Sequence, residues 1–181
     1  MTRDLDWNIL VTAREGGART VWSELRRLAP LRRTGFRNVA IGRVVDFETF
    51  AAAVDTARHQ KPFLDQTLGR VLPIERTFDV DVPTLAATLT DAARPLVDRL
   101  RGRSFHVRVE RRGHKGVLDS SIVEHDLAER LCAVLRERGE TPLVTFGDPD
   151  VVVVVELVGN VGGLGFVTRE LRARYPFVHV D

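Results

Sequence analysis

Apolar positions along this chain follow two periods, one typical of strands and one typical of helices, and the two alternate. Short apolar runs closed by polar residues predict strands, whereas apolar positions spaced three and four apart predict helices. The first third predicts strands over residues 6–13, 38–45 and 70–78, and helices over 18–28 and 47–59. Asp46 is a suitable N-cap for the second helix, and Pro62 is expected to end it.

The remainder begins with an apolar helical pattern over 81–100, which Pro95 is expected to kink. Residues 104–112 alternate apolar and polar side chains, the pattern of a strand with one buried face. A helix should follow, capped by Ser120 or Ser121, with Glu124 completing a capping box. The last predicted elements are a doubly covered strand over 151–157, a glycine-rich hairpin or loop over 159–165, a strand over 166–168 and a helix over 169–174.

This order of elements predicts an α+β protein of two domains. The change from a strand to a long helix near residue 80 is the best boundary. We therefore expect domains at residues 1–79 and 80–181.

Composition narrows the class of protein. The chain has 181 residues, 44% hydrophobic and 29% charged, which is ordinary for a folded protein. Its longest apolar run, the five valines 151–155, is far short of the ~20 residues that span a bilayer. Residues 1–6 lack the apolar stretch of a secretory signal, and one cysteine, Cys132, cannot form a disulfide framework. These features predict a cytoplasmic protein without a membrane association.

The charges are unusual in kind and in distribution. Of 27 basic residues, all but Lys61 and Lys115 are arginines, a bias that arginine-rich codon usage or phosphate recognition could produce. Residues 26–43 carry six arginines and no acid, and residues 99–115 carry seven basic residues and one acid, Glu110. Two basic blocks on a nearly neutral chain favour a polyanion-binding surface, although a solvated face remains possible.

No local motif predicts catalysis or a cofactor. The glycines at 159, 163 and 165 resemble a dinucleotide-binding turn, but too few residues follow for the rest of that fold. The five histidines show no metal-ligand spacing, and Cys132 lies among apolar neighbours. We expect no cofactor, no metal and no enzymatic activity.

Residues 104–115 resemble the THUMP domain of RNA-modifying enzymes. The segment 104–113 reads SFHVRVERRG, a helix follows from Ser120, and 148–156 reads DPDVVVVVE. The resemblance runs from about residue 80 to 169, and residues 8–79 look like the N-terminal ferredoxin-like domain that commonly precedes THUMP. The arrangement is most similar to stand-alone THUMP proteins, some of which are tRNA-binding partners of the tRNA cytidine acetyltransferase.

The resemblance implies a non-catalytic protein that binds tRNA and presents it to a separate RNA-modifying enzyme, with cytidine acetylation as the candidate modification. An α+β protein-interaction or regulatory module that has lost RNA binding is the alternative. RNA-facing residues would lie at the end of the strand 104–112 and in the next turn: Arg103, Arg108, Arg111, Arg112, His114 and Lys115. Charge alone suggests a second phosphate contact at Arg14, Arg32, Arg33 and Arg37. On this basis, replacing Arg111 and Arg112 by Ala should weaken binding and spare folding.

Overall fold

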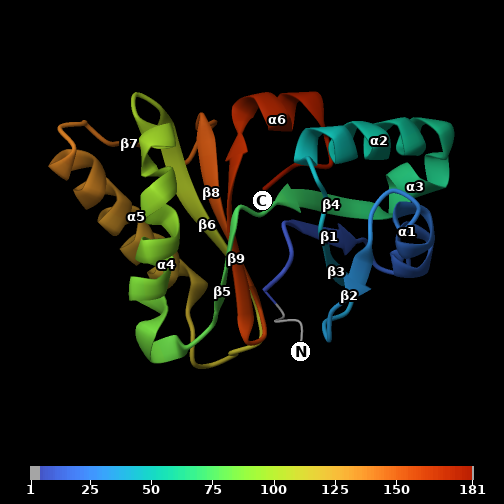
Figure 1. The fold of residues 1–181 in the computed structure, drawn as a ribbon, viewed down its shortest axis with the longest axis horizontal. Helices are drawn as coiled ribbons and strands as arrows, with labels where there is room; N and C mark the ends of the chain where they lie inside the picture. The colour runs from blue at the N-terminus through green and yellow to red at the C-terminus, as the bar shows by residue number, and fades with distance from the viewer. Residues whose placement is uncertain (1–4, 181) are drawn as a thin grey trace. The chain divides into compact units, whose positions relative to one another are not determined.

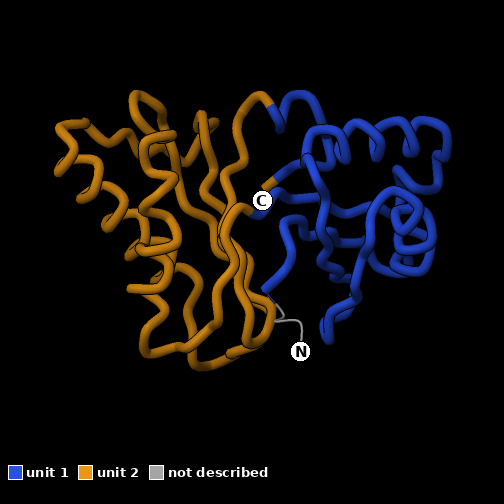
Figure 2. The backbone as a smooth tube through the Cα atoms, in the orientation of Figure 1, with its two compact units in different colours: residues 1–74, 171–179, 181 blue, residues 75–170, 180 orange. Residues whose placement is uncertain are grey.

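The computed structural model of the chain describes residues 5–180, which form two compact units (Figures 1 and 2). The first unit takes the residues up to Ile74 and adds Leu171–His179 from the end of the chain. The second unit holds Glu75–Glu170 and Val180. This division falls five residues before the boundary that the sequence suggests.

The first unit is a four-stranded antiparallel sheet with helices in its two crossovers. Its elements are β1 (Ile9–Ala13), α1 (Ala18–Leu25), β2 (Leu31–Arg33), β3 (Val39–Gly42), α2 (Phe47–Gln60), α3 (Pro62–Thr67) and β4 (Leu68–Pro73). The sheet order is β2-β3-β1-β4, and every neighbouring pair is antiparallel. This strand–helix–strand–strand–helix–strand order is the ferredoxin-like arrangement that the resemblance implies.

Local signals set the helix ends of this unit. The Asp46 carboxylate accepts a hydrogen bond from the Thr49 backbone N–H at 2.8 Å, which confirms the predicted N-cap of α2. Pro62 does end α2 as expected, but it also opens α3, since proline needs no backbone donor in a first turn. The three-residue β2 was not predicted because so short a strand shows no period.

The second unit is a five-stranded mixed sheet. Its elements are β5 (Arg76–Asp79), the 3-10 helix η1 (Val82–Thr84), α4 (Leu85–Ala93), the 3-10 helix η2 (Arg94–Leu100), β6 (Ser104–Arg112), α5 (Ser120–Glu137), β7 (Leu143–Val144), β8 (Val151–Val158) and β9 (Val161–Thr168); α6 (Arg169–Arg174) follows. The sheet order is β5-β9-β8-β6-β7, with β6 parallel to both β7 and β8. Helices α4 and α5 cover one face of this sheet (Figure 1), and the α+β class is confirmed.

The predictions for the second unit are confirmed where a local signal, the alternation of apolar residues or a proline, determines the structure. Strand β6 has the predicted bounds, and α4 gives way to η2 at Pro95. The cap of α5 differs from prediction: the Asp119 carboxylate, not Ser120 or Ser121, accepts from the backbone N–H of Ser121 at 2.9 Å. Glu124 forms no capping box, because its carboxylate accepts from the Val109 backbone N–H at 2.8 Å instead.

The segment predicted as one strand over 70–78 serves both sheets. The Ile74 N–H donates to the Asn8 carbonyl in the first unit at 2.8 Å, and the Glu75 N–H donates to the Leu164 carbonyl in the second at 2.8 Å. Strand β4 therefore pairs with β1, and β5 pairs with β9.

The end of the chain returns to the first unit. The Val71 backbone N–H donates to the Phe177 carbonyl at 2.9 Å, and the Phe177 ring stacks on Tyr175 with centroids 5.6 Å apart. Both aromatic side chains are buried. Within residues 5–180, no helix combines the length and the apolar character needed to cross a bilayer.

The glycine-rich segment, predicted to be a hairpin or a loop, is a hairpin. The turn between its two strands is short. Only Gly159 and Asn160 lie between β8 and β9, and the later glycines are strand residues. Gly162 lies opposite Phe78 of β5, where an added Cβ would come within 2.3 Å of the buried Phe78 ring. The glycines of β9 thus leave room for a neighbouring side chain.

Gly162→Ala should lower the free energy of unfolding in urea by about 1–3 kcal/mol, because the new methyl overlaps the Phe78 ring. Combined with Phe78→Leu, it should cost less than the sum of the single changes. Gly35→Ala, whose Cβ would meet nothing within 4 Å, is the matched control. Strict additivity of the two changes would contradict this role for Gly162.

Asp150 ties the start of β8 to the start of β6. Its carboxylate accepts from the Ser104 backbone N–H at 2.8 Å and from the Ser104 hydroxyl at 2.9 Å. These hydrogen bonds, and then the charge of Arg169, hold the pKa of Asp150 below its usual value. The depressed pKa means that this contribution is present above the unfolded-state pKa and is lost as pH falls through the folded-state value.

Asp150→Asn should therefore lower the melting temperature at neutral pH, and the difference from wild type should shrink below about pH 4. Thermal unfolding followed at several pH values measures this. Asp91→Asn, an exposed change on α4, is the control. A difference that grows on acidification would show that the Asp150 carboxylate does not act as described.

Candidate nucleic-acid interface

Strand β6 fixes the positions of the cations predicted to bind phosphate. Phe105, Val107 and Val109 are buried among the residues of the core, which leaves Arg108 and Glu110 exposed. Strand β7 pairs only with the first two residues of β6. Farther along β6, the Glu124 side chain of α5 satisfies the backbone N–H of Val109.

Arg112 is held within the protein. Its guanidinium donates to the carboxylate of Glu156 on β8, and the two side chains are 13% and 2% exposed. A buried carboxylate is costly unless a cation and hydrogen bonds compensate it. Arg112 therefore neutralises Glu156, so binding a phosphate would require it to abandon a buried charge.

Arg111 and His114 build the turn that follows β6. Arg111 Nη1 donates to the Gly113 carbonyl at 2.9 Å, and its Nε is buried without a hydrogen-bond partner. His114 has a φ of 53°, in the left-handed region, and its Nε2 lies 2.9 Å from the Gly159 carbonyl oxygen. Both residues shape the turn that carries the exposed Lys115.

Three of the six predicted cations in this unit are exposed: Arg103, Arg108 and Lys115. Arg108 Nη1 lies 3.9 Å from Glu124 Oε1, and the Arg108 side chain is 48% exposed. A contact this long and this open to water is weak and screened by salt. Arg103 precedes the start of β6, Arg108 lies within the strand and Lys115 follows its end, so the structure places these cations along β6 and not together at its end.

In the first unit, the two predicted phosphate-binding arginines of β2 lie on opposite faces of the strand. Arg32 and Arg33 are neighbours in the strand, so their side chains point to opposite faces. Arg14 is exposed after β1, and Arg37 Nη2 lies 3.2 Å from Glu15 Oε1 in an exposed ion pair.

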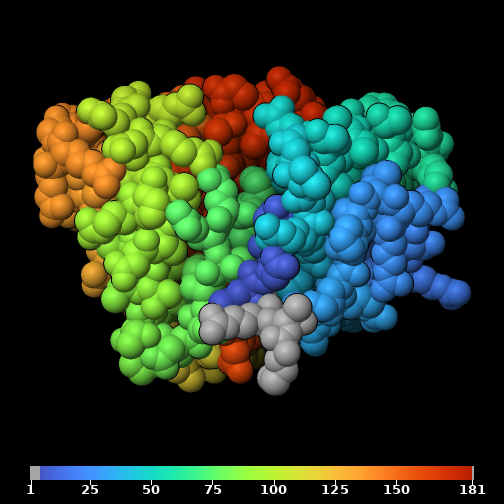
Figure 3. Space-filling view, in the orientation of Figure 1, coloured from blue at the N-terminus to red at the C-terminus, as the bar shows by residue number. Residues whose placement is uncertain are grey.

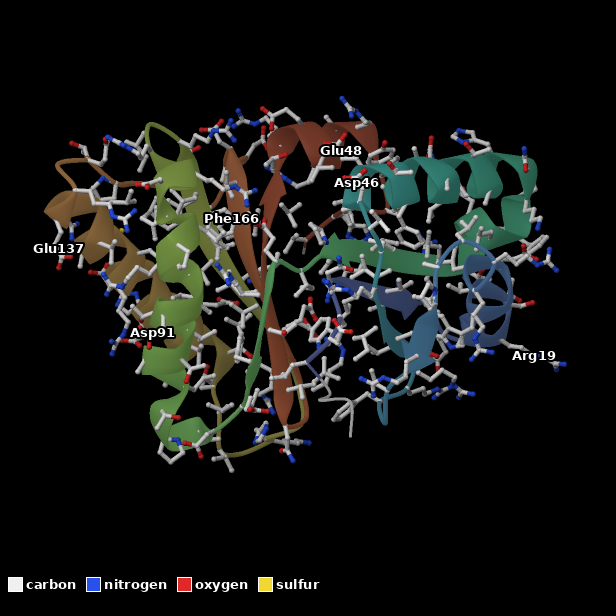
Figure 4. The ribbon with its side chains drawn as sticks, viewed as in Figure 1. Arg19, Asp46, Glu48, Asp91, Glu137 and Phe166 are labelled. Atoms are coloured by element: carbon white, nitrogen blue, oxygen red, sulfur yellow. The ribbon has the colours of Figure 1, made fainter. Side chains whose placement is uncertain are left out.

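Arg33 and Arg37 line a concave surface of about 800 Å³ together with Arg19 and Arg26, which the sequence analysis did not single out. We call this surface the arginine groove and define it by Arg19, Arg26, Arg33 and Arg37 with Trp22 and Phe36. Arg19 extends from α1 in Figure 4, and the blue surface at the right of Figure 3 belongs to α1 and the segment after it. Helical periodicity could have found Arg19 and Arg26, because residues seven apart share a helix face.

No group of three or more His, Cys, Asp or Glu within residues 5–180 is placed to hold a metal ion. Burial raises the pKa of the Cys132 thiol, which disfavours a reactive thiolate. The concentration of exposed guanidinium groups is suited to binding an anion.

Arg112→Ala should lower the free energy of unfolding in urea by about 3–5 kcal/mol, because it removes the guanidinium that pairs with the buried Glu156 carboxylate. Adding Glu156→Gln should recover a large part of that loss. The expectation that replacing both Arg111 and Arg112 spares folding is thus wrong for Arg112, which is not an exposed charge. A wild-type unfolding midpoint for Arg112→Ala would refute this structural role.

Comparison with known proteins identifies the second unit. Residues 81–167 match the THUMP domain family, a span that runs from the residue before η1 to the next-to-last residue of β9. Among curated proteins, no significant match was found.

Solved structures share the fold of both units. TrmN from Thermus thermophilus is 21% identical, with a TM-score of 0.65, and the match covers 87% of this chain and 44% of TrmN. A 4-thiouridine synthetase solved with RNA and ATP is 13% identical, with a TM-score of 0.53, covering 90% of this chain and 41% of the synthetase. A predicted N6-adenine-specific DNA methylase from Listeria monocytogenes is 16% identical, with a TM-score of 0.59, covering 88% and 40%.

This chain thus spans less than half the length of these three proteins. At such identities the likeness concerns the fold, whereas the family match identifies a domain. After the ferredoxin-like unit in sequence, residues 81–167 of the chain match the THUMP domain family.

Proposed function

We propose that this chain is a non-catalytic tRNA-binding protein that presents tRNA to a separate RNA-modifying enzyme in the cytoplasm. The THUMP domain at residues 81–167 is the observation that carries the proposal, since the family occurs in RNA-modifying proteins. A 4-thiouridine synthetase with the same fold was solved as a complex with RNA, which supports RNA as the ligand.

The proposed contacts follow from exposure. Arg103, before the start of β6, Arg108, within it, and Lys115, after its end, would bind phosphates, while Arg111, Arg112 and His114 hold the turn in place. In the first unit, Arg14, Arg32, Arg33 and Arg37 would supply further contacts. Arginine suits this task because its planar fork binds phosphate oxygens in pairs.

The lowered carboxyl pKa values, such as those of Asp46 and Asp150, are explained first by hydrogen bonds that hold the fold. In this proposal the chemistry, for example cytidine acetylation, belongs to the partner enzyme, and this chain contributes binding and orientation of the RNA.

The ion pairs at the end of β6 favour a second candidate, a protein-interaction or regulatory module that no longer binds RNA. Glu156 neutralises Arg112, and Glu124 lies near Arg108, so part of the basic block is balanced within the chain. Among the ion pairs described for residues 5–180, Lys115 has none and the arginine groove has one, the exposed Arg37–Glu15 pair; the charge of Arg103 helps to lower the pKa of Asp150 and of Glu170. The two candidates differ in whether the protein binds RNA.

Filter binding of tRNA at increasing salt tests the choice. About five phosphate contacts should give a slope of log K against log salt of about −3 to −5. Replacing both Arg103 and Lys115 by Ala should reduce the magnitude of the slope by about 1.4–1.8, because each lost contact removes about 0.7–0.9. Arg136→Ala, an exposed change near the end of α5, should leave binding unchanged.

Absence of binding, or binding that does not respond to salt between about 50 and 200 mM, would favour the interaction module. Retained folding of the Arg103/Lys115 variant is checked by its melting temperature. A normal slope for that variant would place the phosphate contacts elsewhere on the protein.

A further inference from the structure

The arginine groove has the composition of an anion site. Four arginines line it, and no Asp or Glu is among its lining residues. The other concave surfaces described in this unit are less basic: one near Trp7 combines Arg32 and Arg43 with Asp6, and one near Val45 has Arg43 beside Asp46. Charge is therefore concentrated where the first unit offers its largest described hollow.

Two walls of the groove come from different elements. Arg19 and Arg26 lie seven residues apart at the two ends of α1, on one face, so they are separated by about 10 Å along the helix. Arg33 ends β2, and Arg37 lies in the loop before β3. At about 3.4 Å per nucleotide in a stacked strand, a wall of this length accompanies about three nucleotides.

The loop of the groove is held by hydrogen bonds. The Thr34 hydroxyl accepts from the Phe36 backbone N–H at 3.1 Å and donates to the Val39 carbonyl at 3.0 Å. The Thr34 N–H also donates to the Val39 carbonyl at 3.1 Å. Phe36 and Arg37 are thus presented by an ordered loop, which reduces the entropy lost when a ligand binds.

Aromatic side chains add a second kind of contact. Phe36, which is half-buried, and Trp22, which is 5% exposed, line the groove together with the four arginines. Basic side chains along the backbone with aromatic rings under the bases are typical of proteins that bind single-stranded nucleic acid. A stacked duplex hides the faces of its bases, so it cannot place a base on Phe36.

The Glu15 partner of Arg37 does not block the groove. Both side chains of that pair are largely exposed, 75% for Arg37 and 82% for Glu15. Exposed ion pairs are weak and screened by salt, so a phosphate can replace Glu15.

From these contacts we propose that the arginine groove binds a single-stranded RNA segment of about three nucleotides, with phosphates on Arg19, Arg26, Arg33 and Arg37 and a base on Phe36. The inference rests on the proposed RNA-binding function and adds the form of the RNA to it. The site lies wholly within the ferredoxin-like unit.

The test compares two probes on the full chain, a short oligouridine and a blunt-ended RNA duplex. Replacing both Arg26 and Arg33 by Ala should reduce the salt slope for oligouridine by about 1.4, at about 0.7 per phosphate contact of a single strand. Binding of the duplex should not change. Arg27→Ala, next to Arg26 on the chain but outside the groove, is the matched control.

Phe36→Leu keeps an apolar side chain for packing and removes the ring. It should weaken oligouridine binding by about 5- to 150-fold, the range of one stacked base, and leave the salt slope unchanged. A second measurement uses tryptophan fluorescence and leaves the groove residues unchanged. It needs the variant Trp7→Phe, which loses no hydrogen bond because Trp7 Nε1 has no partner. Trp22 is then the only tryptophan, and its emission should change when oligouridine binds.

The outcomes separate the two claims. If wild type binds neither tRNA nor oligouridine, the proposed function fails and this inference fails with it. If wild type binds tRNA but the groove variants keep the wild-type slope and affinity for oligouridine, the groove is not the site, while RNA binding stands. If the Arg26/Arg33 variant loses duplex binding as much as oligouridine binding, the claim of single-strand binding is overturned.

Discussion

The buried carboxylate of Glu156 determines what the basic end of β6 can do. It lies in the strand next to β6, opposite Glu110 in register, and its side chain is 2% exposed. A charge in that position needs a cation from its own chain, and Arg112 supplies it. The run of arginines that marks this segment in the sequence is therefore part of the fold as well as part of the surface.

Sequence patterns predicted the bounds of helices and strands better than they predicted which strands pair with each other. The alternation over 104–112 gave β6 its correct bounds because period-two burial is a local property. The segment 70–78 reads as one strand, but backbone hydrogen bonds on either side of the Ile74–Glu75 junction go to different sheets. Pairing partners are non-local, and no pattern within the segment records them. The need for glycine in β9 could not be predicted for the same reason, since Phe78, which lies opposite Gly162, is far away in sequence.

The candidate site shows the same limit for charge. Arg108 and Arg112 lie on the same face of β6 by alternation, yet one is 48% exposed and the other 13%. The difference comes from Glu156 on a neighbouring strand, which the residues around Arg112 do not reveal. Counting cations along the chain also missed Arg19. The other arginines of the groove lie on the same helix face, in β2 and in the loop after it, so they are not neighbours of Arg19 in sequence.

These placements bear on why the basic residues are nearly all arginine. Several positions use the planar group in ways an ammonium cannot match: Arg99 lies 5.0 Å from the centre of the Phe166 ring, and Arg58 lies 5.9 Å from that of Phe177. Arg58 also contacts both Asp55 and Asp65, and these hydrogen-bonded carboxylates raise the pKa of its guanidinium. Codon usage explains an excess of arginine anywhere on a surface, but it does not explain arginines over rings and between carboxylates. At those positions the guanidinium is part of the fold, so the arginines available for the proposed RNA contacts are the ones that no ring or buried carboxylate holds.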